Sequence, residues 1–369
     1  MRVLQIINSL GTGGAEKLLL DTIPLYRKAG VEMDVLLFWN NNHQFVNALK
    51  ALDCCNVFVL NNSSNVKDIY HPNNILKLRK YLKQYDIAHI HLFPAQYFAV
   101  FANILNGNSC KLIFTEHNTF NRRMDKKYLL PIEKFVYRKY TKIVCISQEI
   151  KRVFSDNLNI ENDKFILIHN GVNLSTLENA NTFTLKTINS NLEEDDKLII
   201  QVSAFRPQKD QKTLIRALSY VKDEKVKILL VGDGECREEC ENLVRQLGLG
   251  NRVLFLGQRI DVPSLLKSSD IVVLSSHYEG LSLSSIEGMA SGNPFVASNV
   301  PGLKDIVDGA GVLFECGNEQ ELASEIKELL SNKEYYNKII ETCLLRSEQY
   351  DISLMVQKHL ELYQEVYES

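Results

Sequence analysis

Short apolar runs alternate with helical patterns along almost the whole chain. The runs before residue 170 are Val3–Ile7, Met33–Phe38, Val57–Leu60, Ile87–Leu92, Leu112–Thr115, Ile143–Ile146 and Phe165–Ile168. Those after residue 196 are Leu198–Ser203, Lys227–Val231, Val253–Leu256, Ile271–Leu274, Phe295–Ala297 and Val312–Phe314. Patterns with apolar positions three and four apart separate most of them, for example Gly14–Lys28, Asn74–Gln84, Gln211–Val221 and Glu235–Leu247. Near-continuous apolar strands between helices predict parallel sheets covered on both faces.

The strand–helix series occurs twice, which predicts an α/β protein with two Rossmann-like, doubly wound domains. A chain of 369 residues also favours two domains over one. The stretch Val172–Asp196 is polar and aperiodic, so we expect the boundary there. We place the first domain at 1–175, the second at 190–350 and a terminal helix at 351–369. The apolar positions of that helical pattern, Ile352–Tyr367, are Leu354, Met355, His359, Leu360, Leu362, Tyr363 and Val366.

Composition is that of an ordinary soluble globular protein, with 45% hydrophobic and 24% charged residues. No apolar run approaches the ~20 residues needed to span a bilayer. The N-terminal apolar run is short, is interrupted by Asn8 and leads into a glycine-rich turn, which is not typical of a secretory signal. The eight cysteines show no metal-type spacing. We therefore expect a cytoplasmic protein with reduced thiols and no metal site.

Charge is unevenly distributed. Residues 1–180 carry 22 Lys and Arg against 15 acidic residues, whereas residues 181–369 carry 20 against 30. This predicts that the first half meets something anionic. The cations of 122–142 are Arg122, Arg123, Lys126, Lys127, Lys134, Arg138, Lys139 and Lys142, with apolar side chains between them. The segment could be an interfacial helix on anionic lipid or an ordinary amphipathic surface helix.

Candidate ligand-binding residues of the first half follow strands. Gly13 and Gly14 end a glycine-rich turn and open a helix, where the backbone can approach a ligand and anions are favoured; a turn that touches nothing is the alternative. No acidic residue follows the second strand, which disfavours an NAD-dependent oxidoreductase. His117 follows strand Leu112–Thr115 and could donate to a sugar hydroxyl or a phosphate oxygen, unless neighbouring backbone satisfies it. His89 and His91 share a strand face, and we expect them to be packed and hydrogen-bonded.

In the second half, two cations follow strand Leu198–Ser203. Arg206 can bind phosphate bidentately and Lys209 can act as a point charge, so the pair suits a diphosphate, although loop cations are often only solvated. Gly232 follows strand Lys227–Val231 and is consistent with a nucleotide-facing turn.

Two glutamates follow strand Ile271–Leu274. Glu279 lies in the loop, and Glu287 lies about one turn into a helix that begins near Ser282 or Ser284. The functional interpretation pairs these carboxylates with ligand hydroxyls. The alternative is that Glu279 is a solvated loop acid and that Ser284–Glu287 forms a capping box.

Taken together, these residues resemble the retaining glycosyltransferases of family 4. The strongest part is HYEGLSLSSIEGMASGNPFVASNVPGLKDIV at residues 277–307. The supporting parts, in order, are Gly13-Gly14-Ala15-Glu16, His117, Ile168-His169-Asn170-Gly171-Val172, and Gln208-Lys209 leading into Thr213-Leu214-Ile215. The resemblance covers essentially the whole chain. It implies the GT-B fold: two facing Rossmann-like domains, with a C-terminal helix that crosses back to the first.

The resemblance also implies a role for each matching residue. Glu279 would contact donor sugar hydroxyls near the reacting carbon, Glu287 the ribose hydroxyls, and Arg206 and Lys209 the diphosphate. The backbone amides of Leu281, Ser282 and Leu283 would add donors to the phosphate. From the first domain, Gly13 and Gly14 would approach donor and acceptor, and His117 would contact the donor sugar or its phosphate. One departure is Ala204, where the family often has Arg; because alternate residues of an extended segment point to the same side, we expect Arg206 to substitute.

The implied reaction moves a hexose-type sugar from a nucleoside diphosphate, UDP before GDP, to an acceptor hydroxyl with retention of configuration. The acceptor would be a lipid-linked saccharide in surface polysaccharide assembly, and no cofactor or divalent metal is expected. A nucleotide-sugar epimerase of the same architecture and a non-catalytic nucleotide-sugar-binding protein are the alternatives. Nucleic acid is not an expected partner, because the second half is acidic and no basic-aromatic platform is present.

Overall fold

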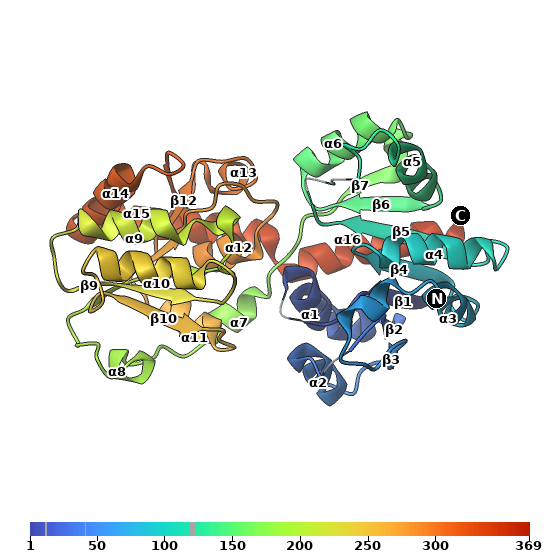
Figure 1. The fold of residues 1–369 in the computed structure, drawn as a ribbon, viewed down its shortest axis with the longest axis horizontal. Helices are drawn as coiled ribbons and strands as arrows, with labels where there is room; N and C mark the ends of the chain where they lie inside the picture. The colour runs from blue at the N-terminus through green and yellow to red at the C-terminus, as the bar shows by residue number, and fades with distance from the viewer. Residues whose placement is uncertain (12, 41, 119–120, 122) are drawn as a thin grey trace. The chain divides into compact units, whose positions relative to one another are not determined.

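The computed structural model describes residues 1–11, 13–40, 42–118, 121 and 123–369. The chain forms two compact units. The first comprises residues 1–171 and 352–369, and the second comprises residues 172–351. Each is a parallel sheet with helices packed against it (Figure 1).

The first unit contains a seven-stranded sheet of order β3-β2-β1-β4-β5-β6-β7. Its strands are β1 (Arg2–Ile7), β2 (Glu32–Leu37), β3 (Val57–Val59), β4 (Ile87–His91), β5 (Lys111–Glu116), β6 (Lys142–Cys145) and β7 (Phe165–Leu167). Its helices are α1 (Gly14–Lys28), α2 (Gln44–Ala51), α3 (Asn74–Leu82), α4 (Ala95–Ile104), α5 (Leu130–Arg138), α6 (Gln148–Leu158) and α16 (Ile352–Glu368). Two 3-10 turns, η1 (Val66–Tyr70) and η2 (Asn162–Lys164), complete the unit.

The position of α16 follows from the strand order. Parallel connections are right-handed, so α1 and α2 cover one face while the chain steps from β1 to β3. The steps from β3 back to β4 and on to β7 run the other way and place α3 to α6 on the opposite face. The α1 face of β4 would then lack a cover, and α16 supplies it by packing beside α1 and on β4 (Figure 1).

The second unit contains a six-stranded sheet of order β10-β9-β8-β11-β12-β13. Its strands are β8 (Lys197–Val202), β9 (Val226–Val231), β10 (Val253–Gly257), β11 (Ile271–Leu274), β12 (Phe295–Ser298) and β13 (Val312–Phe314). Its helices are α7 (Leu174–Glu178), α8 (Leu185–Ile188), α9 (Gln211–Ser219), α10 (Arg237–Gln246), α11 (Val262–Lys267), α12 (Leu283–Met289), α13 (Lys304–Val307), α14 (Glu319–Ser331) and α15 (Lys333–Ser347). The 3-10 turns are η3 (Pro207–Lys209) and η4 (Glu348–Tyr350).

These elements confirm the predicted α/β class, with two Rossmann-like sheets and a terminal helix that returns to the first unit. Each predicted run lies on a strand of the described chain, with ends that differ by no more than one residue. Residues 172–196, expected between domains, pack with the second unit. On α16, Leu354 was assigned to the apolar face but is 45% exposed, whereas Val356 is buried.

Candidate active site

The ion pair Lys209–Glu279 lies where the strand order of the second sheet reverses. Lys209 ends η3, which follows β8, and Glu279 lies in the loop after β11, the neighbouring strand. Lys209 Nζ is 2.5 Å from Glu279 Oε1, and the two side chains are only 16% and 7% exposed. Open α/β sheets bind ligands at the carboxyl ends of the strands beside such a reversal. The structure therefore brings together two of the predicted site residues at a position suited to a ligand.

Hydrogen bonds hold the two loops together. Ser276 Oγ donates to Glu279 Oε1 over 2.6 Å, which fixes the carboxylate from its own loop. Gln201 Nε2 donates to the Lys209 carbonyl over 2.9 Å, and His277 N–H donates to the Gln208 carbonyl over 2.8 Å. These hydrogen bonds fix the loops that carry Lys209 and Glu279, so the ion pair is preorganised before a ligand binds.

Two glycines allow the surrounding backbone to approach closely. Gly232 has a φ of +131°, and a Cβ there would collide with the Ser203 carbonyl. Gly302 has a φ of +83°, and a Cβ there would collide with the Glu279 carbonyl. Gly232 was a predicted site residue, and the structure gives it a packing role against the loop after β8. Gly302 was not singled out, although its Pro-Gly dipeptide is a turn signal.

Arg206 lies differently from the expectation. β8 ends at Val202, and Arg206 N–H bonds to the Ala204 carbonyl over 2.9 Å, so the chain turns instead of continuing extended. The argument that residues 204 and 206 share a side of an extended segment is therefore wrong. Arg206 is exposed and forms no salt bridge with any residue that the structure describes.

Helix α12 begins at Leu283, with Ser282 as its N-cap, which confirms one of the two predicted starts. The third helical residue is then Ser285, so the proposed capping box of Ser284 with Glu287 is not formed; within the described chain the Ser282 side chain makes no capping bond. Glu287 lies half-buried on α12, and Leu281 is buried before the helix.

In the first unit, the predicted residues also follow strands next to a reversal of strand order. β1 and β4 are the strands between which the order changes, and β5 adjoins β4. Gly13 is the N-cap of α1 and Gly14 is its first residue, both exposed, while Thr12 of the same turn lies outside the described residues. His117 follows β5 directly and is half-buried.

A cluster of histidines lies behind His117. His91 Nδ1 is 3.1 Å from His117 Nε2, and the rings of His89 and His91 lie 4.5 Å apart. Burial lowers the pKa of His117 to about 4, with the nearby His359 adding to the effect. Burial also holds the pKa values of His89 and His91 well below their usual range. The prediction that His89 and His91 are packed and hydrogen-bonded is confirmed.

Glu116, the last residue of β5, is a titratable neighbour that the sequence did not single out. Burial raises its pKa to about 7, although Tyr137 Oη and the Asn118 amide donate to its carboxylate. No signal in the sequence marks Glu116, because a polar residue at the end of a strand is common.

Two cations of residues 122–142 are neutralised within the unit. Arg123 Nε lies 2.5 Å from Oε1 of Glu133, which is fully buried, and Lys142 pairs with Glu365 of α16 over 2.9 Å. Arg122 lies outside the described residues. The cations left at the surface or half-buried are Lys126, Lys127, Lys134, Arg138 and Lys139.

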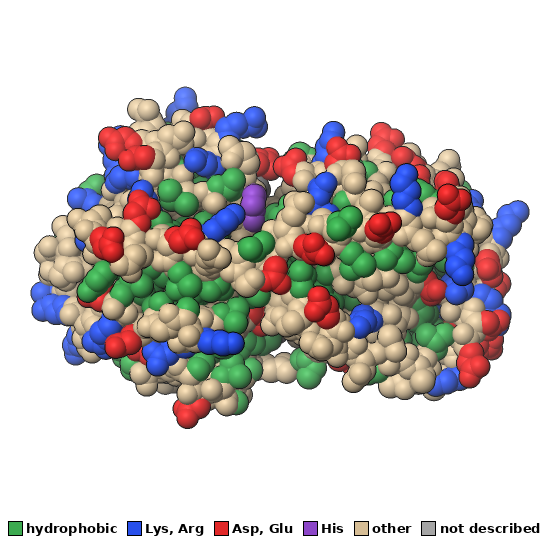
Figure 2. Space-filling view, turned by 180° about the vertical axis from the view of Figure 1, so that it is seen from behind, with side chains coloured by type: hydrophobic (Ala, Val, Ile, Leu, Met, Phe, Trp, Pro, Cys, Tyr) green, Lys and Arg blue, Asp and Glu red, His purple; other side chains and the backbone are tan. Residues whose placement is uncertain are grey.

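Exposed apolar side chains accompany these cations. Tyr128 is 74% exposed and Phe135 is 42% exposed. A groove of about 370 Å³ runs along α5 between Lys127 and Arg138. In Figure 2 the first unit, on the left, shows lysine and arginine side chains beside hydrophobic ones on the face drawn.

The described residues contain no group of three or more His, Cys, Asp or Glu side chains arranged to hold a metal ion. None of the helices in the described ranges has the length and hydropathy to cross a membrane.

Comparison with known proteins extends these observations. The model of Glycosyltransferase Family 4 matches residues 12–176, and that of Glycosyl transferases group 1 matches residues 184–343. The UDP-Gal:alpha-D-GlcNAc-diphosphoundecaprenol alpha-1,3-galactosyltransferase of Escherichia coli is 30% identical over 251 residues, which cover 65% of this chain and 64% of that protein. An uncharacterized glycosyltransferase of Methanocaldococcus jannaschii is 34% identical over 205 residues, 54% of this chain and 53% of that protein. The chain thus spans less than two thirds of the length of these curated relatives.

Among solved structures, Anabaena HepE in complex with UDP and glucose superposes with a TM-score of 0.84 at 23% identity, over 99% of each chain. That likeness shows a shared fold. Because the two family models between them match most of the chain and the fold agrees, the chain belongs to the family 4 glycosyltransferases.

Proposed function

We propose that the protein is a retaining hexosyltransferase that uses a nucleoside diphosphate sugar, UDP-linked before GDP-linked. The observation that carries the proposal is the Lys209–Glu279 pair at the reversal of the second sheet. A diphosphate needs a cation and sugar hydroxyls need acceptors, and this pair offers both within 2.5 Å. The naming of UDP-Gal in the E. coli relative and of UDP in the Anabaena complex supports a UDP-sugar donor.

The chemistry depends on charge at the leaving group. As the bond to the sugar breaks, negative charge grows on the diphosphate, and a preorganised cation in a poorly hydrated site stabilises it. Lys209, fixed by backbone bonds and 16% exposed, is suited to this role, with the exposed Arg206 as the second cation. Glu279 would accept from donor sugar hydroxyls and Glu287 from the ribose. None of these roles requires a divalent metal ion.

The direct test measures donor binding and turnover in Lys209→Met and Glu279→Gln. Loss of a charge-assisted hydrogen bond costs about 2 kcal/mol, so Lys209→Met should weaken binding of the UDP-sugar roughly thirtyfold in a calorimetric titration. Lys197→Met is the matched control. Lys197 begins β8, at the end away from Lys209, where it pairs with Asp270 and is 52% exposed. Equal affinity of Lys209→Met and Lys197→Met would refute the assignment.

Turnover separates the alternatives. A transferase Glu279→Gln variant should bind donor but lose most of its turnover, whereas a binding protein would have no turnover to lose. Conversion of the donor sugar without any acceptor would identify an epimerase instead. The anomeric configuration of the product, read from its proton NMR couplings, tests retention. A thermal-shift panel of nucleotide sugars identifies the donor, since a ligand at a hundred times its dissociation constant stabilises by roughly 2.7 kcal/mol.

We further propose that the acceptor is a lipid-linked saccharide and that α5 docks on anionic lipid from the cytoplasmic side. The E. coli relative is named for a diphosphoundecaprenol-linked acceptor. The exposed Phe135 of α5 can enter the lipid interface while Arg138 of α5 and Lys127, just before the helix, meet the headgroups. A capsule or other surface polysaccharide would be the destination.

Liposome flotation tests the docking. Each cation near an anionic surface contributes about 1 kcal/mol, so Lys127→Glu with Arg138→Glu should abolish flotation with anionic vesicles. Lys50→Glu with Lys83→Glu makes the same change of charge at exposed positions elsewhere in the unit and should leave flotation unchanged. Flotation that is independent of anionic lipid, or equal in the two double variants, would contradict docking by α5.

A further inference from the structure

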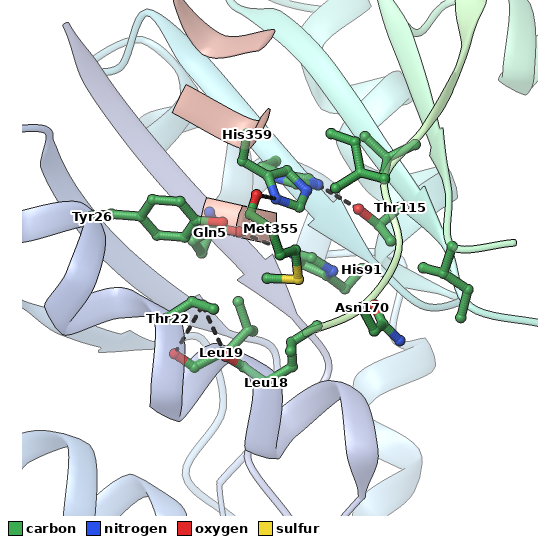
Figure 3. A pocket seen from close by; sticks show the side chains of 14 residues that line it. Gln5, Leu18, Leu19, Thr22, Tyr26, His91, Thr115, Asn170, Met355 and His359 are labelled. Atoms are coloured by element: carbon green, nitrogen blue, oxygen red, sulfur yellow. Dashed lines mark hydrogen bonds between the residues drawn. The ribbon is translucent and has the colours of Figure 1, made fainter. Parts of the chain in front are cut away.

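A chain of hydrogen bonds crosses the first unit between α16 and His117. Its members lie on the sheet face that α16 covers: Gln5 on β1 is level with His89 on β4, and His91 on β4 is level with Thr115 on β5. Tyr363 of α16 reaches this face and is fully buried. Figure 3 shows Gln5, His91 and Thr115 of the sheet around one small cavity with Met355 and His359 of α16.

The bonds form one continuous series. Gln5 contacts His91 Nε2 through Oε1 over 2.9 Å and Tyr363 Oη through Nε2 over 2.9 Å. His91 Nδ1 forms the next hydrogen bond of the series, to His117 Nε2 over 3.1 Å. In the other direction, Tyr363 Oη lies 2.6 Å from His89 Nδ1, and His89 Nε2 lies 2.6 Å from Thr115 Oγ1.

Because the rings are neutral, each carries one ring proton, and the series fixes which nitrogen holds it. Burial keeps the pKa values of His91 and His117 below their usual range, so neither is doubly protonated at neutral pH. The Gln5 carbonyl oxygen can only accept, so the proton of His91 is on Nε2. His91 Nδ1 is then an acceptor, and the proton of His117 must be on Nε2.

The orientation of the Gln5 amide decides the direction of the whole series. Gln5 Nε2 also points at the Met33 sulfur over 3.6 Å, a weak acceptor. The reverse orientation would place the amide oxygen against that sulfur, which has no proton to donate. Tyr363 also favours this orientation of the Gln5 amide, because the Tyr363 oxygen accepts from Gln5 Nε2 while its hydroxyl proton is donated to His89 Nδ1.

We propose that Gln5 and Tyr363 are positioning residues that hold His117 in the tautomer protonated on Nε2. The remaining nitrogen, Nδ1, has no partner among the described residues and is an acceptor, so it suits a ligand hydroxyl and not a phosphate oxygen. The tautomer stands on this structure alone, whereas its use by a sugar donor rests on the proposed function. It also reverses the sequence-based expectation, in which His117 was a donor to a sugar hydroxyl or a phosphate oxygen.

The test reads the tautomer directly. Two-bond proton–nitrogen correlation spectra of ¹⁵N-histidine-labelled protein distinguish the two neutral tautomers, and a His117→Gln spectrum assigns the signal among eight histidines. The wild type should show His117 protonated on Nε2. Tyr363→Phe and Gln5→Leu should each give a mixture of tautomers. Tyr140→Phe is the matched control, since it loses a buried tyrosine bond, to the Gln96 carbonyl, outside the series.

A His117 proton on Nδ1 in the wild type overturns the proposal, and this measurement needs no variant to fold. A pure Nε2 tautomer in both Tyr363→Phe and Gln5→Leu overturns it as well. Donor affinity is the second readout: Tyr363→Phe should lose three- to tenfold, the value of one neutral hydrogen bond, and Tyr140→Phe nothing. If the tautomer shifts while Tyr363→Phe and His117→Gln bind donor like the wild type, the positioning stands and the proposed role of His117 in donor binding fails.

Discussion

Replacing His359 by leucine should make the first unit less sensitive to acid. His359 lies on α16 and is only 5% exposed. Its Nδ1 donates to the Met355 carbonyl over 3.0 Å, and its Nε2 is buried with no partner in the described part of the chain. Burial lowers its pKa to about 4, so the folded unit excludes a proton that the unfolded chain accepts.

The size and sign of the effect follow from linkage. The ordinary pKa of histidine is about 6.5, so the unfolded chain gains the proton first as the pH falls. The free energy of unfolding therefore decreases below pH 6.5 and continues to do so until the pH nears 4, where the folded state also titrates. A gap of roughly 2.5 units amounts to about 3.4 kcal/mol in full, and to about 2 kcal/mol at pH 5.

Other buried groups titrate in the same range and are shared by wild type and variant. The neutral His89, His91 and His117 add to the loss of stability in acid, by the same sign argument. Glu116 acts oppositely: its pKa is raised to about 7, so the folded unit gains a proton before the unfolded chain does, and stability rises as the pH falls toward 4.5. The difference between wild type and His359→Leu therefore reports on His359 together with the smaller effect of its charge on His89, His91 and His117.

Urea unfolding followed by tryptophan fluorescence gives the measurement. The chain has one tryptophan, Trp39, which is buried in the first unit and so reports on that unit. His359→Leu should differ from wild type by less than about 1 kcal/mol at pH 7.5, because an unpartnered buried nitrogen is replaced by carbon, and should exceed it by about 2 kcal/mol at pH 5. His71→Gln, an exposed histidine of the same unit, serves as the control. Parallel pH profiles for wild type and His359→Leu would refute the reasoning.

Two further predictions concern a buried charge and a glycine. Arg123→Met leaves the fully buried Glu133 without its cation and should lower the urea stability of the first unit by about 3 kcal/mol. Arg2→Met, which breaks an exposed pair with Glu32 in the same unit, should cost under about 1 kcal/mol; equal losses would contradict the first assignment. Gly302→Ala should lower donor affinity at least tenfold in a calorimetric titration, because its Cβ would displace the loop before α12. Gly292→Ala has the same φ of +83° with open space around the Cβ and should bind normally; if both variants lose affinity alike, backbone strain and not the collision is the cause.

The sequence predicted the strands and both sheets because each strand is a local apolar run. The location of Lys209 and Glu279 at one edge of the second sheet was also predictable, since each follows such a run and parallel strands end at one edge. The turn at Arg206 was not, because one hydrogen bond to the Ala204 carbonyl decides it. The capping box failed for a similar reason: a helix that begins two residues earlier than the motif requires changes every position that follows.

Long-range pairs account for what the sequence could not predict. Arg123 read as one of many surface cations, although its partner Glu133 is buried by packing that no local pattern records. Gln5 and Tyr363 lie 358 positions apart and are bonded to each other. The sequence placed Tyr363 on the apolar side of its helix and Gln5 within an apolar run, but no local pattern pairs this amide with this hydroxyl.

The sheet beneath α16 explains why polar residues lie on the apolar side of this helix. The α1 face of β4 has no crossover helix, and it presents His89 and His91 with Gln5 of β1 alongside, all of which need hydrogen-bond partners when covered. A purely apolar helix would leave the Gln5 amide and His89 Nδ1 without their oxygen partner, at about 1–3 kcal/mol each. Tyr363 answers that requirement by bonding to Gln5 and His89 at once. The terminal helix therefore serves the first unit as a hydrophobic cover and as the hydrogen-bond partner of its central strands, and a substitution that preserves only the first property, such as Tyr363→Phe, should separate the two.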